Sequence, residues 1–365
     1  MVVVMQEHAS QEQIQRVIDR LVSNGFDVHR STGESHTVLG AVGVHPDYDP
    51  RDIEVLEGVR EVVRITKPRK PRSQAAQPVE VSPFHRVAVI GTGLVGGSFA
   101  LALRAHFREV QIVGFDRAPV VERAMARGIV PEAAADIAAA VRGADLIYIA
   151  LPIAAAIDMF PAIAASARAD ALVTDACSTK AVVCGAARKC FRDGARFLGG
   201  HPMAGQESSG VENAGGDLFR GSPYALIGTE DESDPRVAAF ARVLRAMGAN
   251  PVWCDAETHD WAVGIVSHLP QLLSVALARV VSDETDETRL PVSLAGRGLR
   301  DSLRLAGSSY DIWRDVCLTN TQNIARALDR LGQAVEHLRT HLTSRELQAE
   351  FAGANELYKI LNQLK

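Results

Sequence analysis

Short apolar segments alternate with amphipathic stretches through the middle of the chain. The apolar segments lie at 86–90, 111–115, 146–151, 172–175 and 196–199, and the stretches between them show helical spacing. Continuous apolar runs such as 146–151 are typical of strands that are covered on both faces. The alternation predicts an α/β fold with a parallel, doubly wound sheet of the Rossmann type. Residues 225–228 and 251–253 are expected to extend this sheet.

The first 70 residues show another order of elements. Strands are predicted at 2–4, 26–29, 37–43 and 59–65, and helices at 11–24 and 49–56. On the first helix one face is expected to hold the apolar residues Ile14, Val17, Ile18, Leu21 and Val22. The order β-α-β-β-α-β predicts a ferredoxin-like α+β domain over residues 1–70.

The rest of the chain divides by composition. A basic, proline-rich stretch predicts a linker, which we place at 71–84, and the nucleotide-binding domain follows at 85–256. Residues 257–365 have an almost entirely helical pattern, as in 320–342. Long apolar helical faces often pack on a second subunit, so we expect a helical dimerisation domain and a homodimer.

Composition narrows the class of protein. The 365 residues can form two or three domains, and the net charge of −5 argues against a nucleic-acid or membrane-surface partner. No apolar run approaches the ~20 residues of a membrane span, and the N-terminus lacks the basic flank of a signal peptide. The cysteines are Cys177, Cys184, Cys190, Cys254 and Cys317. Their spacing fits no metal site, so we expect reduced thiols, no metal and a cytoplasmic location.

A glycine-rich segment follows the first strand of the sheet. Its residues are Gly91, Thr92, Gly93, Leu94, Val95 and Gly96. Gly91 would allow the tight turn, Gly93 would let the backbone approach a pyrophosphate, and Gly96 would let the helix pack on the strand. The amides at the helix start favour phosphate. The segment predicts a dinucleotide-binding site; a glycine turn without a ligand is the alternative.

The residues at the ends of the next strands indicate which dinucleotide would bind. Asp116 ends the second strand, where it can accept hydrogen bonds from a ribose 2′-hydroxyl, which favours NAD. Arg117 beside it could instead pair with a 2′-phosphate, so NADP stays open. Leu151 and Pro152, at the end of 146–151, are also expected to contact the cofactor because ligands bind beyond the carboxyl ends of the strands.

Two groups of polar residues could carry chemistry. His201 follows the strand predicted at 196–199, in a predicted loop, where it could act as a general base, and Ser178 could orient its ring or merely cap a helix. Arg300 and Arg304 are four residues apart and would share one helix face. Guanidinium groups bind carboxylates with two hydrogen bonds, which suits a dicarboxylate substrate. A solvated basic face is the alternative.

Several motifs together resemble those of the prephenate/arogenate dehydrogenase family of tyrosine biosynthesis. They are the glycine segment, Asp175 to Lys180, His201-Pro202-Met203-Ala204-Gly205, Ser267-His268-Leu269-Pro270 and Arg300-Asp301-Ser302-Leu303-Arg304 with Trp313 after it. The resemblance covers residues 86 to about 359. It implies oxidative decarboxylation of prephenate to 4-hydroxyphenylpyruvate with NAD⁺ as the hydride acceptor.

The resemblance also implies roles for single residues. His201 would polarise the ring hydroxyl at C4 and take its proton, and Ser178 would orient it. The implied substrate-binding residues are His268, Arg300, Asp301, Arg304 and Glu207, with Asp301 and Glu207 in an ionic network around Arg304. Gln271 departs from the family pattern, which often has histidine there; it can still bind a substrate carbonyl or carboxylate. Gln206 gives an arogenate ammonium no charged partner, which favours prephenate and leaves an arogenate or cyclohexadienyl dehydrogenase open.

Residues 1–70 are similar to the ferredoxin-like regulatory domain of some DAHP synthases. The matching stretches are Met1-Val2-Val3-Val4, His29-Arg30-Ser31, Thr37-Val38-Leu39-Gly40 and 62–68. The resemblance implies that His29 and Ser31 contact L-tyrosine as an effector; the residues alone show only a polar pair at a strand end. Two other hypotheses are a 3-hydroxyacid-type dehydrogenase that uses Lys180, and a non-catalytic NAD and tyrosine sensor that partners a DAHP synthase.

Overall fold

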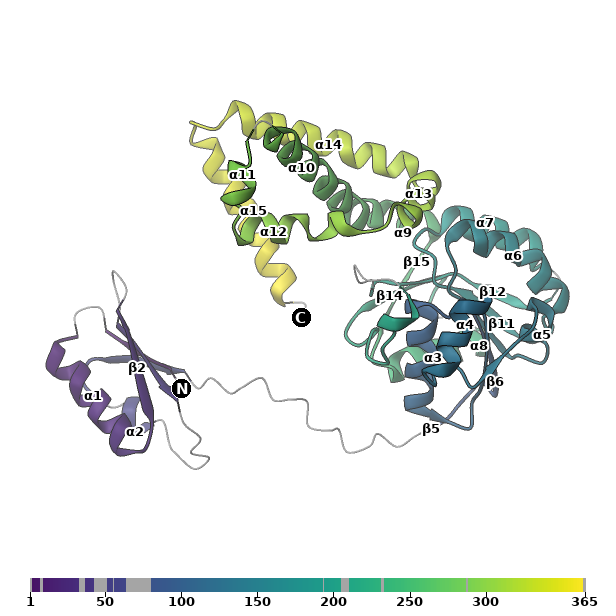
Figure 1. Cartoon of the computed structure of the whole chain (residues 1–365), viewed down its shortest axis with the longest axis horizontal. Coiled ribbons are helices and arrows are strands. Elements are labelled where there is room, and N and C mark those ends of the chain that lie inside the picture. The colour runs from purple at the N-terminus through teal and green to yellow at the C-terminus, as the bar shows by residue number, and fades with distance from the viewer. Residues whose placement is uncertain are drawn as a thin grey trace. The chain divides into compact units, whose positions relative to one another are not determined.

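The computed structural model describes the chain in two compact units, Met1–Gln77 and Pro78–Lys365 (Figure 1). The residues outside the description are 1, 7–8, 33–36, 43–50, 55, 64–79, 193, 205–209, 231–232, 287 and 364–365. Most of the predicted linker therefore lies outside the described residues. Its last part belongs to the second unit, because strand β5 (Glu80–Val81) pairs with β7 (Phe107–Arg108) and Phe84 is buried.

The first unit is an antiparallel sheet with two helices. Its elements are β1 (Val2–Met5), α1 (Gln11–Ser23), β2 (Asp27–Thr32), β3 (Thr37–Val42), α2 (Arg51–Glu54) and β4 (Val59–Val63). The strand order β2-β3-β1-β4 is that of a ferredoxin-like domain, as predicted. Helix α1 begins with a capping box at Ser10 and buries Ile14, Val17 and Leu21. Val22, expected on the same face, is instead exposed, because it lies at the rim of the apolar stripe.

The second unit is built on a six-stranded parallel sheet. Its strands are β6 (Arg86–Ile90), β8 (Gln111–Phe115), β9 (Glu132–Ala133), β10 (Leu146–Ile149), β11 (Leu172–Asp175) and β12 (Arg196–Leu198). Their order in the sheet, β12-β11-β10-β6-β8-β9, is the Rossmann order. The order reverses between β6 and β10, and this is where such sheets bind their ligands. The helices around the sheet are α3 (Leu94–His106), α4 (Ala118–Ala126), α5 (Ile137–Val141), α6 (Ile153–Ser166), α7 (Ala181–Cys190) and α8 (Pro235–Ala246).

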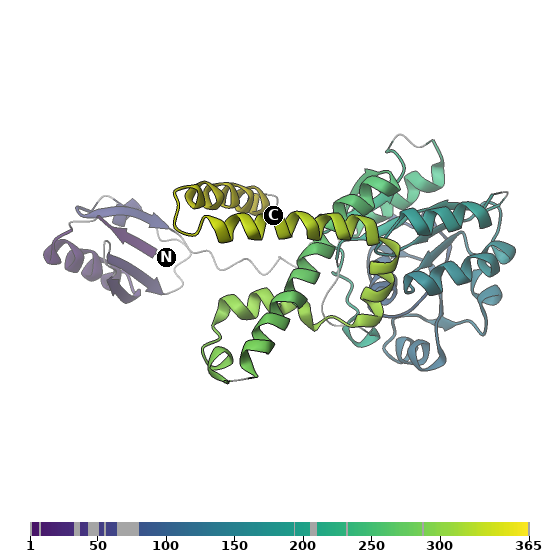
Figure 2. The same cartoon turned by 90° about the horizontal axis from the view of Figure 1, so that it is seen from above.

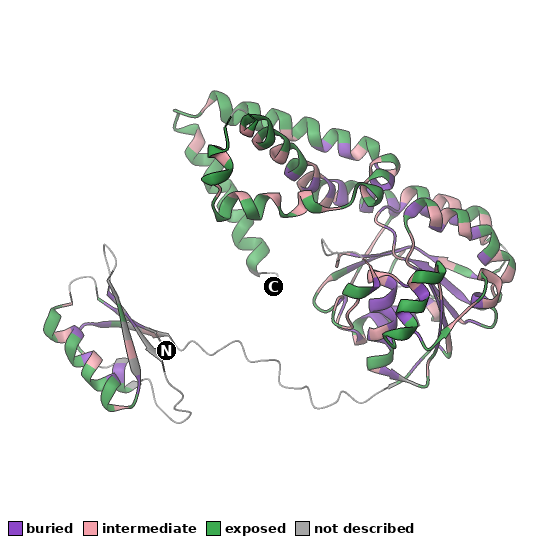
Figure 3. Cartoon of the chain, in the orientation of Figure 1, coloured by how far each residue is buried: buried purple, intermediate pink, exposed green. Residues whose placement is uncertain are grey.

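Alternate residues of the central strand serve two separate cores. Leu146 and Tyr148 of β10 belong to one apolar cluster, in which the Tyr148 ring stacks on Phe99 at 3.8 Å between ring centres. Ile147 and Ile149 belong to the cluster on the opposite face. The sheet is thus covered on both faces, as the continuous apolar run predicts (Figure 3).

The structure of residues 200–254 differs from the predicted one. Strands β13 (Gly200–Pro202), β14 (Pro223–Ile227) and β15 (Asn250–Cys254) form a separate three-stranded sheet and do not extend the main one. His201 therefore lies in a strand, paired with Ala225, and not in a loop. The prediction failed because β13 is only three residues long, too short to show a periodic pattern.

The C-terminal part is helical. It comprises α9 (Ala256–Val263), the π-helical turn η2 (Gly264–His268), α10 (Leu269–Thr285), α11 (Leu290–Ser293), α12 (Arg297–Leu303), the 3-10 turn η3 (Arg304–Gly307), α13 (Tyr310–Thr319), α14 (Thr321–Thr340) and α15 (Glu346–Gln363). Helix α15 turns back from the end of α14 (Figure 2). Among the described residues, the run Ala256–Thr285 is long and apolar enough to cross a membrane. This is weak evidence of a membrane span, because core helices pass the same test. This run carries the buried Asp260 and His268.

Candidate active site

The glycine segment forms the turn between β6 and α3. Gly91 has φ +93°, and a Cβ there would lie 2.3 Å from the carbonyl oxygen of Ala150. At Gly96 a Cβ would lie 1.8 Å from the carbonyl oxygen of Gly91, so helix and turn approach too closely for a side chain. A Cβ at Gly93, the N-cap of α3, would meet no described atom within 4 Å. The protein alone does not require glycine at position 93.

These features fit a dinucleotide. The space over Gly93 is where a pyrophosphate would lie, against the helix amides that have no side-chain cap. Leu151 and Pro152 follow β10, the neighbour of β6, so they border the same switch point. The residues present therefore suit NAD, with the glycine turn holding the phosphates.

Asp116 directly follows the neighbouring strand β8 and binds the glycine turn. Its Oδ2 accepts a hydrogen bond from the Thr92 amide at 2.7 Å, and its Oδ1 accepts one from the Arg117 amide at 2.7 Å. An ionised carboxylate has about four acceptor positions, so some stay open for ribose hydroxyls. Arg117 is the exposed N-cap residue of α4. The carboxylate thus has a structural role besides the predicted contact with the cofactor.

His201 is the first of three side chains that are joined by hydrogen bonds. Its Nδ1 lies 2.9 Å from Nε2 of His259, and Nδ1 of His259 lies 2.8 Å from Oδ1 of Asp260. The Asp260 carboxylate also accepts hydrogen bonds from the amides of Lys180 at 2.7 Å and Ala181 at 2.9 Å. All three side chains are buried.

The chain of contacts fixes the tautomers. An ionised Asp260 can only accept, so Nδ1 of His259 carries a hydrogen and its Nε2 accepts. Nδ1 of His201 must then donate, and Nε2 of a neutral His201 is left as an acceptor. Burial, with the nearby His259, Lys180 and His268, holds the pKa of His201 well below its usual value, so the ring stays neutral.

Ser178 does not make the orienting contact that we expected of it. Within the described residues, Nδ1 of His201 is held by His259, and Ser178 is half-buried in the segment after β11. A role for Ser178 on the Nε2 side of the ring remains a prediction.

A buried ion pair supports the strand that carries His201. Nζ of Lys180 contacts Oδ2 of Asp175 and donates to the carbonyl oxygen of Gly200 at 2.6 Å. Oδ1 of Asp175 accepts from the Gly200 amide at 3.1 Å. Burial opposes the charge on Lys180, but Asp175 together with the nearby Cys177 and Cys184 keeps the pKa of Lys180 above its usual value. A fully buried and paired Lys180 is unsuited to the substrate-contacting role that the 3-hydroxyacid hypothesis gave it.

His268 lies near this chain, in the π-helical turn. Its Nδ1 is 3.1 Å from Nδ2 of Asn320, which also donates to the backbone oxygen of Asp260 at 2.7 Å. The His268 ring meets Trp313 edge-on, with 5.7 Å between ring centres. Burial lowers the pKa of His268 to about 4, so this side chain is neutral at physiological pH. Such π-turns often occur at functional sites.

Gln271 has partners within the protein, and its contact with a substrate stays a prediction. Its Nε2 donates to the carbonyl oxygen of Leu305 at 2.8 Å. Ser274, one turn later, donates to the carbonyl oxygen of Ser302 at 2.8 Å and accepts from the Ala306 amide at 3.0 Å. Both side chains are buried and hold residues 302–306 against α10.

The predicted arginine cluster lies on the segment that α10 holds. Arg300 and Asp301 are in α12, whereas Arg304 is its C-cap and starts the turn η3. All three are exposed. Their place in the substrate site stays a prediction, and Gln206 and Glu207 lie outside the described residues.

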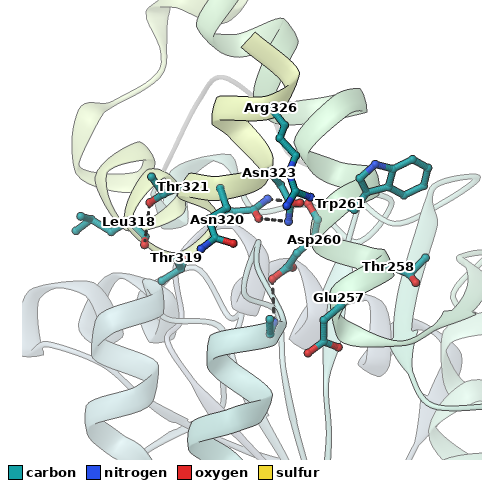
Figure 4. A pocket seen from close by; sticks show the side chains of 12 residues that line it. Glu257, Thr258, Asp260, Trp261, Leu318, Thr319, Asn320, Thr321, Asn323 and Arg326 are labelled. Carbon is teal, nitrogen blue, oxygen red and sulfur yellow. Dashed lines mark hydrogen bonds between the residues drawn. The ribbon is translucent and has the colours of Figure 1, made fainter. Parts of the chain in front are cut away.

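A cavity of about 680 Å³ is lined by Asp260 and other residues of α9 and by residues of α13 and α14 (Figure 4). Its lining includes Trp261, Asn323 and Arg326. Nδ2 of Asn323 donates to Oδ1 of Asn320 at 2.8 Å, which orients the amide that binds the Asp260 backbone. The cavity therefore borders Asp260 and the asparagines that hold its backbone, and His201 is not among the residues that line it.

Sequence reasoning missed His259 and Asp260. The signal that could have found them is a histidine and an aspartate side by side within the apolar run 256–285. Polar residues on a buried helix need partners, and such positions are common in catalytic sites.

The fold and this site define a nicotinamide-nucleotide-dependent dehydrogenase with a buried, neutral imidazole. Residues 99–252 match the nucleotide-binding domain of prephenate dehydrogenase, 255–363 match its dimerization domain, and 1–67 match the DAHP synthase ferredoxin-like domain. The chain is 32% identical to the prephenate dehydrogenase of Lactococcus lactis subsp. cremoris, over 72% of this chain and 73% of that one. It belongs to the prephenate dehydrogenase family and is an NAD-dependent oxidoreductase.

Two solved structures extend the comparison. The prephenate dehydrogenase of Aquifex aeolicus in complex with hydroxyphenyl propionate and NAD⁺ is 29% identical, with a TM-score of 0.68, and the match covers 79% of this chain and 99% of that one. The arogenate dehydrogenase of Synechocystis is 28% identical, with a TM-score of 0.60, over 76% and 96% of the two chains. The family thus includes enzymes named for either substrate.

Proposed function

We propose that this enzyme oxidises and decarboxylates prephenate to 4-hydroxyphenylpyruvate. The observation that carries the proposal is the chain Asp260–His259–His201, which leaves Nε2 of a neutral His201 as a base. NAD, when bound on the glycine turn, supplies the hydride acceptor. His201 accepts the proton of the ring hydroxyl as that carbon is oxidised, and loss of carboxylate as CO₂ leaves an aromatic ring.

Neighbouring residues hold His201 and the turn that carries Arg304 in the positions that the proposal requires. Donation from Nδ1 to His259 prevents the ring from turning its protonated nitrogen toward the substrate. The hydrogen bonds from Gln271 and Ser274 fix the turn that carries Arg304, whose guanidinium binds a substrate carboxylate in this proposal. In this proposal Ser178 acts on the Nε2 side of His201, and the neutral ring of His268 contacts the substrate.

Prephenate is proposed over arogenate because Gln206 is neutral and would give the arogenate ammonium no charged partner. Purified enzyme is incubated with each substrate and with NAD⁺ or NADP⁺, and the reduced cofactor is followed by its absorbance. We expect kcat/KM to be highest with prephenate and NAD⁺. A clear preference for arogenate would overturn the substrate, and turnover of neither would overturn the function.

We further propose that the enzyme is a cytoplasmic homodimer regulated by L-tyrosine. The match of residues 255–363 to a dimerization domain supports the dimer, and five free cysteines suit a reducing compartment. Residues 1–67 match the DAHP synthase ferredoxin-like domain, and in this proposal His29 and Ser31 of that domain contact tyrosine. Both positions lie in β2, with His29 opposite Gly40. A DAHP synthase could be a partner through the same domain.

A further inference from the structure

A group of ligand-type side chains lies far from the catalytic residues, where α14 ends and α15 begins. His337 and His341 are four residues apart at the end of α14, and Glu346 and Glu350 are four residues apart at the start of α15. Residues at this spacing share one helix face. Each helix therefore directs a pair of metal-ligand side chains toward the other.

The distances bring these atoms together. One ligand atom each from His337, His341 and Glu346 lie within 4.8 Å of one another. Nε2 of His341 lies 2.6 Å from Oε2 of Glu346, and Nε2 of His337 lies 3.3 Å from Oε1 of Glu350. Ligand atoms around a tetrahedral zinc ion are about 3.4 Å apart. Small rotations of exposed side chains are enough to reach that geometry.

The tautomer of His341 makes it a ready ligand. Its Nδ1 lies 2.8 Å from the carbonyl oxygen of His337, which can only accept, so Nδ1 carries a hydrogen. Without a further cation, Nε2 would then direct a lone pair at the Glu346 carboxylate. Either a second proton or a metal ion must lie between the two atoms. A hydrogen bond from the other ring nitrogen to a backbone oxygen is the usual support of a metal-bound histidine.

We propose that His337, His341, Glu346 and Glu350 bind one divalent transition-metal ion, zinc by preference, that fastens α15 to α14. Two neutral imidazoles and two carboxylates balance the charge of such an ion and suit zinc in type and number. As bare ion pairs these contacts would hold the hairpin weakly, because all four side chains are partly or largely exposed.

The test uses the full chain with any histidine tag removed and with metals stripped by EDTA. The protein is titrated with Co²⁺, whose visible absorption reports tetrahedral coordination, and then with Zn²⁺ in competition. We expect one metal ion per chain. His341→Ala and Glu346→Gln should each weaken binding at least tenfold, and His85→Ala, at an exposed histidine outside the cluster, should not.

Glu346→Gln keeps the size of an exposed side chain, so it tests the site even if His341→Ala folds poorly. Circular dichroism checks the fold of each variant. Absence of stoichiometric binding at micromolar metal, or equal binding by Glu346→Gln and the unaltered chain, would overturn the proposal and leave only proton-bridged pairs. Zn²⁺ should also raise the Tm of the unaltered chain and not that of the two cluster variants.

Discussion

At the scale of single residues, His201 is the side chain whose replacement is most informative. His201→Asn removes the base but can still hydrogen-bond His259, so the site should stay assembled. General bases contribute about 10²–10⁴ in rate, and kcat should fall by that factor while the Kd for NAD⁺ is unchanged. Steady-state kinetics and a fluorescence titration with NAD⁺ measure the two quantities. His85→Asn is the matched control, and a loss of kcat below about tenfold would exclude the base role.

The depressed pKa of His201 predicts the pH dependence. The neutral ring is the active form, and burial and neighbouring positive charge keep it neutral below the usual histidine pKa of about 6.5. Lowering the pH from 8 to 6.5 should therefore leave kcat/KM for prephenate unchanged, and the decline should begin at lower pH. An acid limb centred at or above pH 6.5 would show that His201 is not shielded as described.

The sequence predicted a catalytic role for His201 but not its contact with His259. His259 is 58 residues away in the chain, and which ring nitrogen carries hydrogen depends on a contact between a strand and a helix. Local patterns carry no information on such contacts. The same holds for Gln271, whose type suggested a substrate contact and whose partners in the protein are the backbone oxygen of Leu305 and the hydroxyl of Ser308.

At the scale of elements, the strand–turn–helix of the nucleotide site separates two kinds of glycine. Gly96→Ala places a Cβ 1.8 Å from a backbone oxygen and should destabilise the fold by about 3 kcal/mol. Gly93→Ala meets open space, so stability should fall by no more than about 1 kcal/mol while NAD⁺ binding weakens at least tenfold. Urea unfolding and NAD⁺ titration distinguish these outcomes. Equal NAD⁺ affinity in Gly93→Ala would place the pyrophosphate elsewhere.

Helix α10 and the turn η3 give a second prediction at this scale. Ser274→Ala leaves the Ala306 amide and the Ser302 carbonyl without this partner, which costs about 1–3 kcal/mol and loosens the turn that carries Arg304. The KM for prephenate should rise severalfold, and kcat should change less. Ser282→Ala, at an exposed position of the same helix, is the control. An unchanged KM would mean that the turn does not position a substrate-binding group.

The elements themselves were largely predictable. Strands 86–90, 111–115 and 172–175 have the predicted bounds, because continuous apolar runs between polar turns leave few alternatives. The short strands β5, β7, β9 and β13 were not predicted. Two or three residues carry no periodicity, and long-range pairing alone determines their conformation.

At the scale of the whole molecule, the N-terminal unit is the proposed regulatory part. Removal of residues 1–77 should leave a folded dehydrogenase, since this unit has its own core around Val3, Val17 and Leu39. If tyrosine acts through it, the truncated enzyme should keep its kcat and lose its response to tyrosine. Initial rates with and without tyrosine decide this. Inhibition that survives the truncation, competitive with prephenate, would place tyrosine in the active site.

The origin of the catalytic chain has a consequence for how the enzyme can be controlled. His201 belongs to the dinucleotide-binding half, whereas His259 and Asp260 come from the first helix of the other half. His201 gains its contact with His259 only when the two halves are packed together. A displacement of about 1 Å between them would lengthen the contact of 2.9 Å beyond hydrogen-bonding distance and free the ring to flip. The basicity proposed for His201 thus depends on how the two halves are packed. An effector that moved the halves apart would lower the activity without binding at the substrate site.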